Sequence, residues 1–344
     1  MRARQKPVHG SRANMITIGG TELNKIFALI FTVISLLLGS GRSPVNAEYV
    51  EIGSYPQSRV SSPEIISALE NQPDEWKTFG YFSGNGSEGS AVQSDFMRYA
   101  DVELDGKKYR AVVFDKYRPM KTCGTHSSET YQDDNGYEPN TVYWFEYEPL
   151  KWRRVDKEKG LLMCESIIDS QPFSNTIYKI GGAYYSDRQG KNLAHDYAES
   201  SIRRWLNEDF YNTAFSDDEK ERISVNACNQ QYFPRVKEHG EMTVYDKVFM
   251  LSRTEATDSE YGFSSMNTAD RMRRGIATDY AECQGIHVCE IGFGHKGNSC
   301  WWMRAPGFHS KRVNKVFYDG YCSVDSYYEV TLTDIGVRPC IICK

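Results

Sequence analysis

Side chains able to bind a metal or carry redox chemistry gather in one short stretch near the C-terminus. Cys283 and Cys289 lie six positions apart. The same stretch of 18 positions also holds His287, His295 and Cys300. Soft thiol and imidazole ligands suit copper(I) or zinc. Because the spacing matches no common metal motif, the favoured interpretation is a local disulfide or inert loop cysteines, and a metal or redox site is the alternative.

Three further patterns match binding motifs only in part. Cys340-x-x-Cys343 has no second cysteine pair, which a structural zinc site needs. Residues 292–297 fit the GxGxxG spacing, but the segment 298–302 that follows is predicted as strand where a dinucleotide site requires a helix. Glu138-Pro139-Asn140 equals the sugar-binding tripeptide of calcium-dependent lectins but has no second ligand segment. These patterns predict no catalytic residue, no metal and no cofactor.

The segment around residues 301–309 holds the side chains best suited to binding a ligand. Trp301 and Trp302 are consecutive in a predicted strand, so they point to opposite faces, and we expect one in the core and the other beside the loops. Arg304 offers a planar fork for a carboxylate. It forms either an internal ion pair that fixes the loop or a ligand contact next to Trp302 and His309. Trp302, Arg304 and His309 are therefore the candidate ligand-binding residues.

The composition of the chain is typical of a folded soluble protein. Of 344 residues, 40% are apolar and 25% are charged, and the formal net charge is −5. Without residues 1–47, 35 basic and 45 acidic residues remain, a net charge of −10. An acidic surface repels phosphate backbones, so nucleic-acid binding is not expected. No run of Lys and Arg predicts a membrane-surface patch.

Residues 1–47 are predicted to be a secretory signal peptide. The segment 26–38 reads IFALIFTVISLLL, and Val45 and Ala47 supply small residues at a cleavage site. A helix of this apolar segment is about 20 Å long, which is short of the ~30 Å hydrocarbon core, and an uncleaved anchor is the alternative. We expect a mature chain that begins at Glu48 and is secreted or lies at the cell surface or in the periplasm.

Nine cysteines follow the predicted signal peptide, and their number is odd. At least one of them therefore stays unpaired or pairs between molecules. Several lie inside apolar runs, such as Cys164 and Cys340. A free thiol in such a run behaves as a small buried hydrophobe. Buried thiols are accordingly favoured over a disulfide framework.

Capping and turn residues predict the elements of the first half of the chain. Ser62 and Pro63 suit the N-cap and first position of a helix over 64–70. Asp105-Gly106 predicts a two-residue hairpin. The strands expected in this half are 101–104, 108–114, 142–147, 150–155 and 160–166.

A helix is predicted over residues 201–212. Its apolar face consists of Ile202, Trp205, Leu206 and Phe210. These positions are spaced i, i+3, i+4 and i+8, which places them on one side of an α-helix. We expect Trp205 and Leu206 to be buried. Ser216 and Glu219 form a capping box that begins a second helix.

The two ends of the mature chain are both predicted as short strands. They cover residues 49–52 and 337–343, and the second is strongly apolar. An apolar terminal strand needs a partner for its backbone groups. Chain ends often lie close together. We expect the two strands to be adjacent in one sheet, with Ile341 in the core.

Six motifs in order resemble a bacterial family of extracellular domains of unknown function. The motifs are Ile52–Gln57 (IGSYPQ), Leu150–Arg153, Leu206–Phe215 (LNEDFYNTAF), Asp246–Ser252, Trp301–Gly307 (WWMRAPG) and Gly336–Pro339 (GVRP). The resemblance spans residues 48–344, which we expect to form a single domain. Residues 60–140 resemble an insertion between the first strand and the core.

The loop-rich C-terminal half is more distantly similar to the C-type-lectin-like fold, including its formylglycine-generating (sulfatase-modifying) branch. This resemblance implies an α+β, C-type-lectin-like mixed fold with short antiparallel strands, two or three helices and long loops. It implies a non-catalytic surface or secreted binding module for an extracellular glycan, peptide or protein. The alternatives are a metal and thiol oxidoreductase that uses Cys283 and Cys289, and a structural envelope protein.

Overall fold

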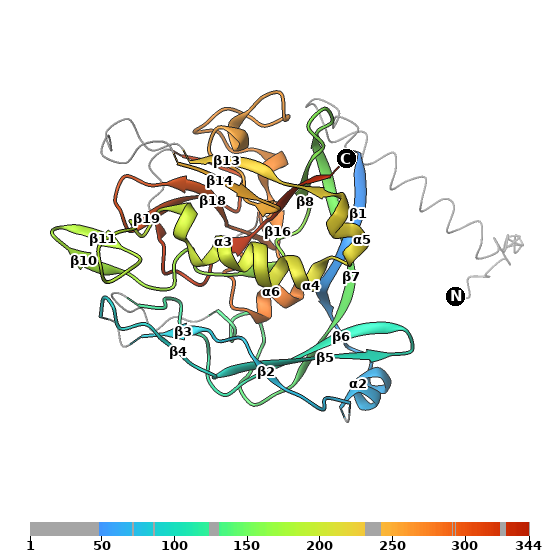
Figure 1. Ribbon diagram of the computed structural model, residues 1–344. Coiled ribbons are helices and arrows are strands. Elements are labelled where there is room, and N and C mark those ends of the chain that lie inside the picture. Colours follow the sequence, from blue (N-terminus) through green and yellow to red (C-terminus); the bar gives the residue numbers. More distant parts are fainter. Residues whose placement is uncertain are drawn as a thin grey trace, which may run out of the picture. The chain divides into compact units, whose positions relative to one another are not determined.

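The computed structural model describes residues 48–70, 72–84, 87–123, 131–230, 242–290, 292, 294–323 and 328–343 (Figure 1). The predicted signal peptide lies outside these residues. Ala47–Lys344 form one compact unit. The fold is a mixture of many antiparallel strands and few helices, 38% strand and 15% helix, as expected for an α+β protein. Among the residues described, no helix combines the length and apolar character that crossing a bilayer requires.

A nine-stranded sheet is organised around its longest strand, β7 (Tyr143–Asp156). β7 pairs antiparallel with β1 (Tyr49–Arg59), with β6 (Lys107–Phe114) near its start and with β8 (Leu161–Cys164) near its end. The remaining strands of this sheet are β2 (Lys77–Thr78), β5 (Met97–Leu104), β12 (Ile223–Ser224), β15 (Val248–Phe249) and β22 (Cys340–Cys343). β7 therefore connects the N-terminal strands to the C-terminal ones.

The two strands expected at 142–147 and 150–155 are one continuous strand. This strand contains Pro149, which lacks a backbone N–H. It lies opposite Ser54, next to a register shift in β1, where the ladder is already interrupted. A proline is tolerated at such an irregularity.

The hairpin and helix predicted before residue 115 are confirmed. Asp105 and Gly106 have φ of 52° and 76° and connect β5 to β6, as a two-residue turn with two positive φ angles requires. The helix α2 (Pro63–Leu69) begins after Ser62, whose side chain accepts from the N–H of Ile65. Together they form a small core that contains Leu69, Ala100, Tyr109, Ala111 and Trp144.

A second sheet of five strands contains the WWMRAPG motif. Its order is β20 (Tyr328–Glu329), β19 (Arg312–Val316), β18 (Trp301–Pro306), β21 (Gly336–Val337) and β9 (Asp169–Ser170). Trp301 and Trp302 point into different core clusters, and both are 0% exposed. The expectation that one of them lies beside the loops is wrong, because β18 is covered on both faces. Each indole N–H donates to a backbone carbonyl, 2.9 Å away.

The two terminal strands share a sheet but are not adjacent. β22 pairs with β8, β12 and β15, whereas β1 pairs with β7. The apolar β8 is the better partner for the apolar β22, because all four residues of each strand are buried. Ile341 is fully buried, as expected. The predicted pairing of the two ends is therefore wrong, although both belong to the same sheet.

The remaining elements are short. Two-stranded sheets are formed by β3 (Phe82–Ser83) with β4 (Val92–Gln93), β10 (Tyr178–Ile180) with β11 (Ala183–Tyr185), β13 (Asn226–Gln230) with β14 (Met242–Asp246) and β16 (Gly275–Ile276) with β17 (Asn298–Ser299). Single 3₁₀ turns are η1 (Tyr197–Glu199), η3 (Glu255–Thr257) and η4 (Arg271–Arg273). The predicted capping box of Ser216 and Glu219 begins α5 (Asp217–Arg222).

One further helix, α6 (Asp279–Cys283), lies in the C-terminal half, which was expected to be loop-rich, and was not among the predicted helices. It has five residues, too few for a clear helical period, and its N-cap Thr278 is the local signal that marks it. All nine cysteines are buried and unpaired, so the prediction of buried thiols is confirmed. Burial raises the pKa of Cys164 to about 12, which keeps that thiol protonated.

Candidate functional site

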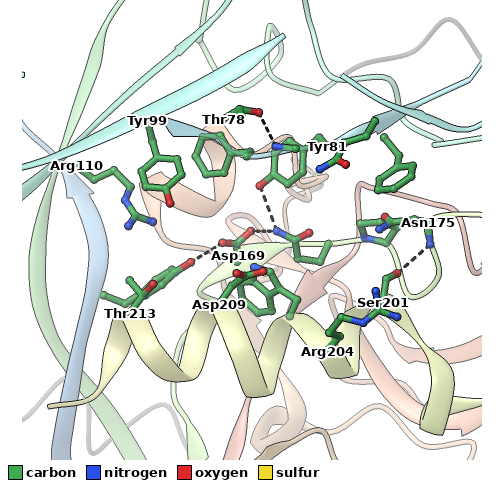
Figure 2. Close-up of a pocket in the computed structure, with 18 residues that line it drawn as sticks. Thr78, Tyr81, Tyr99, Arg110, Asp169, Asn175, Ser201, Arg204, Asp209 and Thr213 are labelled. Atoms are coloured by element: carbon green, nitrogen blue, oxygen red, sulfur yellow. Dashed lines mark hydrogen bonds between the residues drawn. The ribbon is translucent and has the colours of Figure 1, made fainter. Parts of the chain in front are cut away.

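A cleft of about 290 Å³ lies between a helix and a group of short N-terminal strands. Figure 1 shows the helix, labelled α3 and α4, next to β2, β3 and β4. In Figure 2 the helix forms one wall of the cleft and residues 78–82 form the opposite wall. The floor between them contains Tyr55, Asp169 and Gln171. We call the two sides the helix wall (residues 201–213) and the aromatic wall (residues 78–99).

The helix wall is one continuous helix, which confirms the prediction over 201–212. It consists of α3 (Ser201–Trp205), a π-helical turn η2 (Leu206–Phe210) and α4 (Tyr211–Ala214). The side chain of Ser200 accepts from the N–H of Arg203 and caps the helix. In the π turn, the N–H of Tyr211 reaches the carbonyl of Leu206, five residues back.

The π turn keeps two rows of side chains straight along this helix. The core row is Ile202, Leu206, Phe210 and Ala214, and the cleft row is Ser201, Trp205, Asp209 and Thr213. In a regular α-helix each step of four residues turns about 40° past a full turn, so both rows would wind around the helix. A turn closed by an i→i+5 bond holds more residues and corrects this drift. π turns inside α-helices occur frequently at functional sites.

Trp205 is half-buried, not buried as expected, because it belongs to the cleft row. Its ring stacks on Phe210, with centroids 5.6 Å apart, and the rest of the ring lines the cleft. Leu206 is fully buried, as expected. The spacing of apolar residues placed both on one face, but consecutive residues lie about 100° apart around a helix, and Trp205 at the edge of that face reaches the cleft.

The aromatic wall is built from rings that pack on one another. Phe79 stacks on Tyr81, with centroids 5.0 Å apart and planes at 13°, and contacts Tyr99 at 4.8 Å. Phe79, Phe82 and Tyr99 are half-buried. Gly80 has φ of +60°, and a Cβ there would lie 2.1 Å from the side-chain nitrogen of Gln93. The positive φ favours glycine in the turn that presents Phe79 and Tyr81 together.

Asp169 is the central acid of the floor. One of its oxygens accepts from the Tyr55 hydroxyl at 2.9 Å, and the other accepts from the N–H of Ser170 at 2.7 Å and the amide of Gln171 at 3.0 Å. Burial raises the pKa of Asp169 to about 6, and the nearby Arg118 guanidinium limits the rise. Arg118 lies over the Tyr81 ring, 3.7 Å from its centroid.

Arg110 is the central cation of the floor, and its charge is compensated inside the protein. It donates two hydrogen bonds, of 2.7 and 2.8 Å, to the two oxygens of Asp101. A third goes to the Tyr280 hydroxyl at 3.3 Å, and the guanidinium lies over the Tyr99 ring. Burial works to raise the pKa of Asp101, but the hydrogen bonds from Arg110 outweigh it and hold the pKa below its usual value. Asp101 therefore stays ionised as a partner of Arg110.

The helix wall carries two charges of a different kind. Arg204 and Asp209 line the cleft and are exposed to solvent. Within the described part of the chain, neither side chain makes a hydrogen bond or an ion pair. Partial burial, followed by the charge of Glu208, raises the pKa of Asp209. These two groups are available to a ligand, unlike those of the floor.

Arg304, one of the three predicted site residues, is not part of the cleft lining. Arg304 is 3% exposed and donates to both oxygens of Glu255, at 2.6 and 2.9 Å, and to the carbonyl of Met250. Of the two alternatives for Arg304, an internal ion pair or a ligand contact, the structure shows the ion pair. Arg304 also lines a separate pocket of about 90 Å³. Trp302 is fully buried and His309 is exposed in the turn after β18.

The described lining of the cleft includes none of Trp302, Arg304 and His309. Trp302 was expected beside the ligand, but its ring is buried in the core. A ligand-binding role for the three residues stays a prediction. The structure directs attention to the cleft instead.

The thiol and imidazole cluster is divided between the core and a second pocket. Cys283 lies at the end of α6, inside the main core, where burial raises its pKa well above the usual value. Cys289 and His287 line a pocket with Tyr131 and Tyr318. Over the residues described, no group of three or more His, Cys, Asp or Glu side chains is placed to hold a metal ion.

Sequence reasoning missed the cleft, although local signals for it exist. Tyr55 belongs to the IGSYPQ motif, and Asp209 and Thr213 belong to the LNEDFYNTAF motif. The four-residue spacing of the two rows was present in the sequence. The run FGYF at residues 79–82 places aromatic rings around a glycine in a polar segment. No sequence signal identified Asp169, whose role depends on partners more than 100 residues away.

A family model described as a domain of unknown function (DUF6273) matches residues 158–344. The match includes the helix wall and two residues of the floor, Asp169 and Gln171, whereas the aromatic wall precedes it. Searches of curated proteins and of solved structures found no match. The comparisons give no support to the lectin-like and sulfatase-modifying resemblance, which stays a prediction.

Proposed function

The chain belongs to the DUF6273 family of domains of unknown function, and from the geometry of its cleft we propose that it is a non-catalytic binding module for a carbohydrate chain. The observation that carries this proposal is the pairing of half-buried aromatic rings with polar side chains across one cleft. Phe79, Tyr99 and Trp205 contribute the rings, and Gln93 and Asn175 contribute amides.

A sugar ring matches such a lining because it has an apolar face of C–H groups and an edge of hydroxyls. The apolar face packs on an aromatic ring, and the hydroxyls bond to amides, hydroxyls and carboxylates. Ligand sites of this kind combine aromatic walls with a small number of placed polar groups. The cleft volume of about 290 Å³ suits a short length of carbohydrate. A protein partner would need roughly 800 Å² of surface on each side.

The state of the floor favours binding over catalysis. A general acid or base must reach the substrate within hydrogen-bond distance. Both oxygens of Asp169 accept hydrogen bonds from the protein, and Arg110 is held by Asp101. These groups rigidify the cleft and have little freedom to move toward a substrate. The proposed module therefore presents its ligand-facing groups on the two walls.

We also propose that the module acts outside the cytoplasm, on an extracellular carbohydrate. The support is the apolar segment 26–38 followed by small residues at Val45 and Ala47. N-terminal sequencing of protein from its native host tests this part. A mature chain that begins at Glu48 is expected, and a cytosolic protein that retains Met1 or Met15 would contradict it.

Binding measurements on matched variants test the carbohydrate proposal. A panel of oligosaccharides is screened by array and the hits are measured by calorimetry. Phe79→Ala and Trp205→Ala are each expected to weaken binding about tenfold or more, since each removes an aromatic contact face. Tyr245→Ala is the matched control, because Tyr245 is 70% exposed and lies outside the cleft lining. Equal affinity of all three variants and the wild type would refute the cleft as the site.

A further inference from the structure

The charges of the cleft are arranged unequally, and the difference bears on the class of ligand. The charged groups of the floor are engaged internally: Arg110 pairs with Asp101, and Asp169 accepts hydrogen bonds from three donors. The helix wall charges, Arg204 and Asp209, have no such partners among the described residues. A ligand in the cleft therefore meets one unpaired cation and one unpaired acid.

The two unpaired groups lie toward different parts of the cleft. Figure 2 shows Arg204 on the side of Ser201 and Asn175, and Asp209 on the side of Asp169. The Ser201 hydroxyl is held by the backbone N–H of Asn175 at 2.9 Å, which fixes this end of the cleft. The amide side chain of Asn175 lines the cleft next to it. Arg204 thus stands in a neutral, hydrogen-bonding corner.

The opposite end is unfavourable to anions. Beyond Tyr99, a neighbouring pocket is lined by three acids, Asp74, Glu75 and Glu103, and by Lys77, in addition to the Asp101 that pairs with Arg110. The chain as a whole is acidic, with a net charge of −5. A negative group on the ligand is therefore repelled elsewhere and attracted at Arg204. The planar guanidinium matches a carboxylate in two parallel hydrogen bonds, a geometry that a hydroxyl does not offer.

We propose that the ligand is an acidic carbohydrate, an oligosaccharide that contains a hexuronic acid, and that Arg204 binds its carboxylate. The sugar ring packs on Trp205, the next residue in the cleft row, while Asn175 bonds to a hydroxyl. Asp209 at the other end orients the chain, because it repels the carboxylate and accepts from neutral hydroxyls. This inference rests on the proposed function and names its substrate class.

The test compares each uronic-acid oligosaccharide with its carboxyl-reduced counterpart, in which –COOH is replaced by –CH₂OH. The two probes differ only in the charged group. The wild type is expected to bind the acid about tenfold or more tightly than the reduced form, since a charge-assisted pair is lost. Added salt is expected to weaken binding of the acid more than that of the reduced form.

Two variants locate the carboxylate. Arg204→Gln is expected to remove the preference for the acid and to leave affinity for the reduced probe within about twofold, whereas Arg204→Lys retains only part of the preference because it loses the fork. Arg271→Gln, at an exposed arginine outside the cleft lining, is the matched control and is expected to behave as the wild type. Thermal unfolding midpoints confirm that the variants are folded.

The outcomes separate this inference from the proposed function. A preference of the wild type for neutral oligosaccharides, or an unchanged preference for the acid in Arg204→Gln, would overturn the proposal of an acidic ligand. The proposed carbohydrate-binding function would still hold if Trp205→Ala loses binding. Failure of every oligosaccharide, or binding of a short acidic peptide in their place, would overturn both.

Discussion

The two walls of the cleft are held in place by different means. The helix wall rests on a core row whose side chains are buried, and its one ring, Phe210, contacts Tyr55, Trp205 and Phe215. The aromatic wall is made of two-residue strands and of half-buried rings that contact one another. The helix wall is therefore stabilised from behind by a buried row. On the aromatic wall only Tyr81 is buried in the main core, where it bonds to Gln284, and the half-buried rings of Phe79 and Tyr99 pack at the edge of that core.

This difference separates the residues that hold the fold from those that face a ligand. On the helix wall the core row holds the fold and the cleft row faces a ligand, so a cleft-row substitution leaves the core row intact. On the aromatic wall the same rings do both, because Phe79 packs on Tyr81 and also lines the cleft. The helix wall also lies inside the family match, and the aromatic wall lies outside it.

The largest expected effect is at the core row of the helix wall. Phe210→Ala removes a fully buried ring with three aromatic neighbours and is expected to lower the free energy of unfolding by about 3–5 kcal/mol. Urea unfolding followed by fluorescence and circular dichroism measures the change. A loss below about 1 kcal/mol would mean that the helix is not anchored from behind.

A smaller effect is expected at the junction of the two walls, where Asp169 titrates. Its pKa of about 6 in the folded protein lies above that of an ordinary aspartate, near 3.9. Between these two values the folded state binds more protons than the unfolded chain, so this group makes unfolding easier as pH rises. Its contribution falls by about 3 kcal/mol in total, of which about 2 kcal/mol is lost between pH 4 and pH 6, and it becomes constant above about pH 7.

Asp169→Asn isolates this contribution. The stability of the variant is subtracted from that of the wild type at each pH, which cancels other titrating groups such as Glu282. The free energy of unfolding of the wild type is expected to fall relative to that of the variant as pH rises from 4 to 6. A difference that is flat with pH, or that rises, would show that Asp169 does not hold a raised pKa in the folded protein.

The smallest expected effect is on the aromatic wall. Phe79→Ala removes a half-buried ring that packs on Tyr81 and Tyr99, and about 1 kcal/mol of stability is expected to be lost. The same variant is expected to lose ligand binding. A stability loss as large as that of Phe210→Ala would show that Phe79 contributes as much as a core residue, and the distinction between the walls would fail.

Local signals in the sequence were sufficient for the elements that depend on neighbouring residues. The Asp105-Gly106 hairpin, the Ser62 cap and the capping box of Ser216 and Glu219 all formed as predicted. Each depends on backbone geometry and hydrogen bonds within a few residues. The helix over 201–212 was predicted for the same reason. Its π turn was not predicted, and neither was the position of Trp205 in the cleft.

The candidate site could not be predicted because its residues come from distant parts of the chain. Tyr55 and Asp169 are 114 positions apart, and Tyr81 reaches Gln284 across 203 positions. A sequence pattern identifies neither pairing. The arginines of two motifs singled out in the sequence proved to be packed: Arg304 of WWMRAPG binds Glu255, and Arg338 of GVRP donates to the carbonyl of Cys164 at 2.7 Å.

The amino-acid sequence by itself determined the mixed strand and helix composition, the capped helices, the hairpin and the buried character of the thiols. These properties follow from local propensities and from the apolar pattern around each residue. Only the tertiary structure decided that β1 pairs with β7, that both Trp301 and Trp302 enter the core, and that one helix face meets Phe79 and Tyr99 across a cleft. The reason is that each of these contacts is chosen by competition among many apolar surfaces of similar quality, and the winner depends on how all of them pack together.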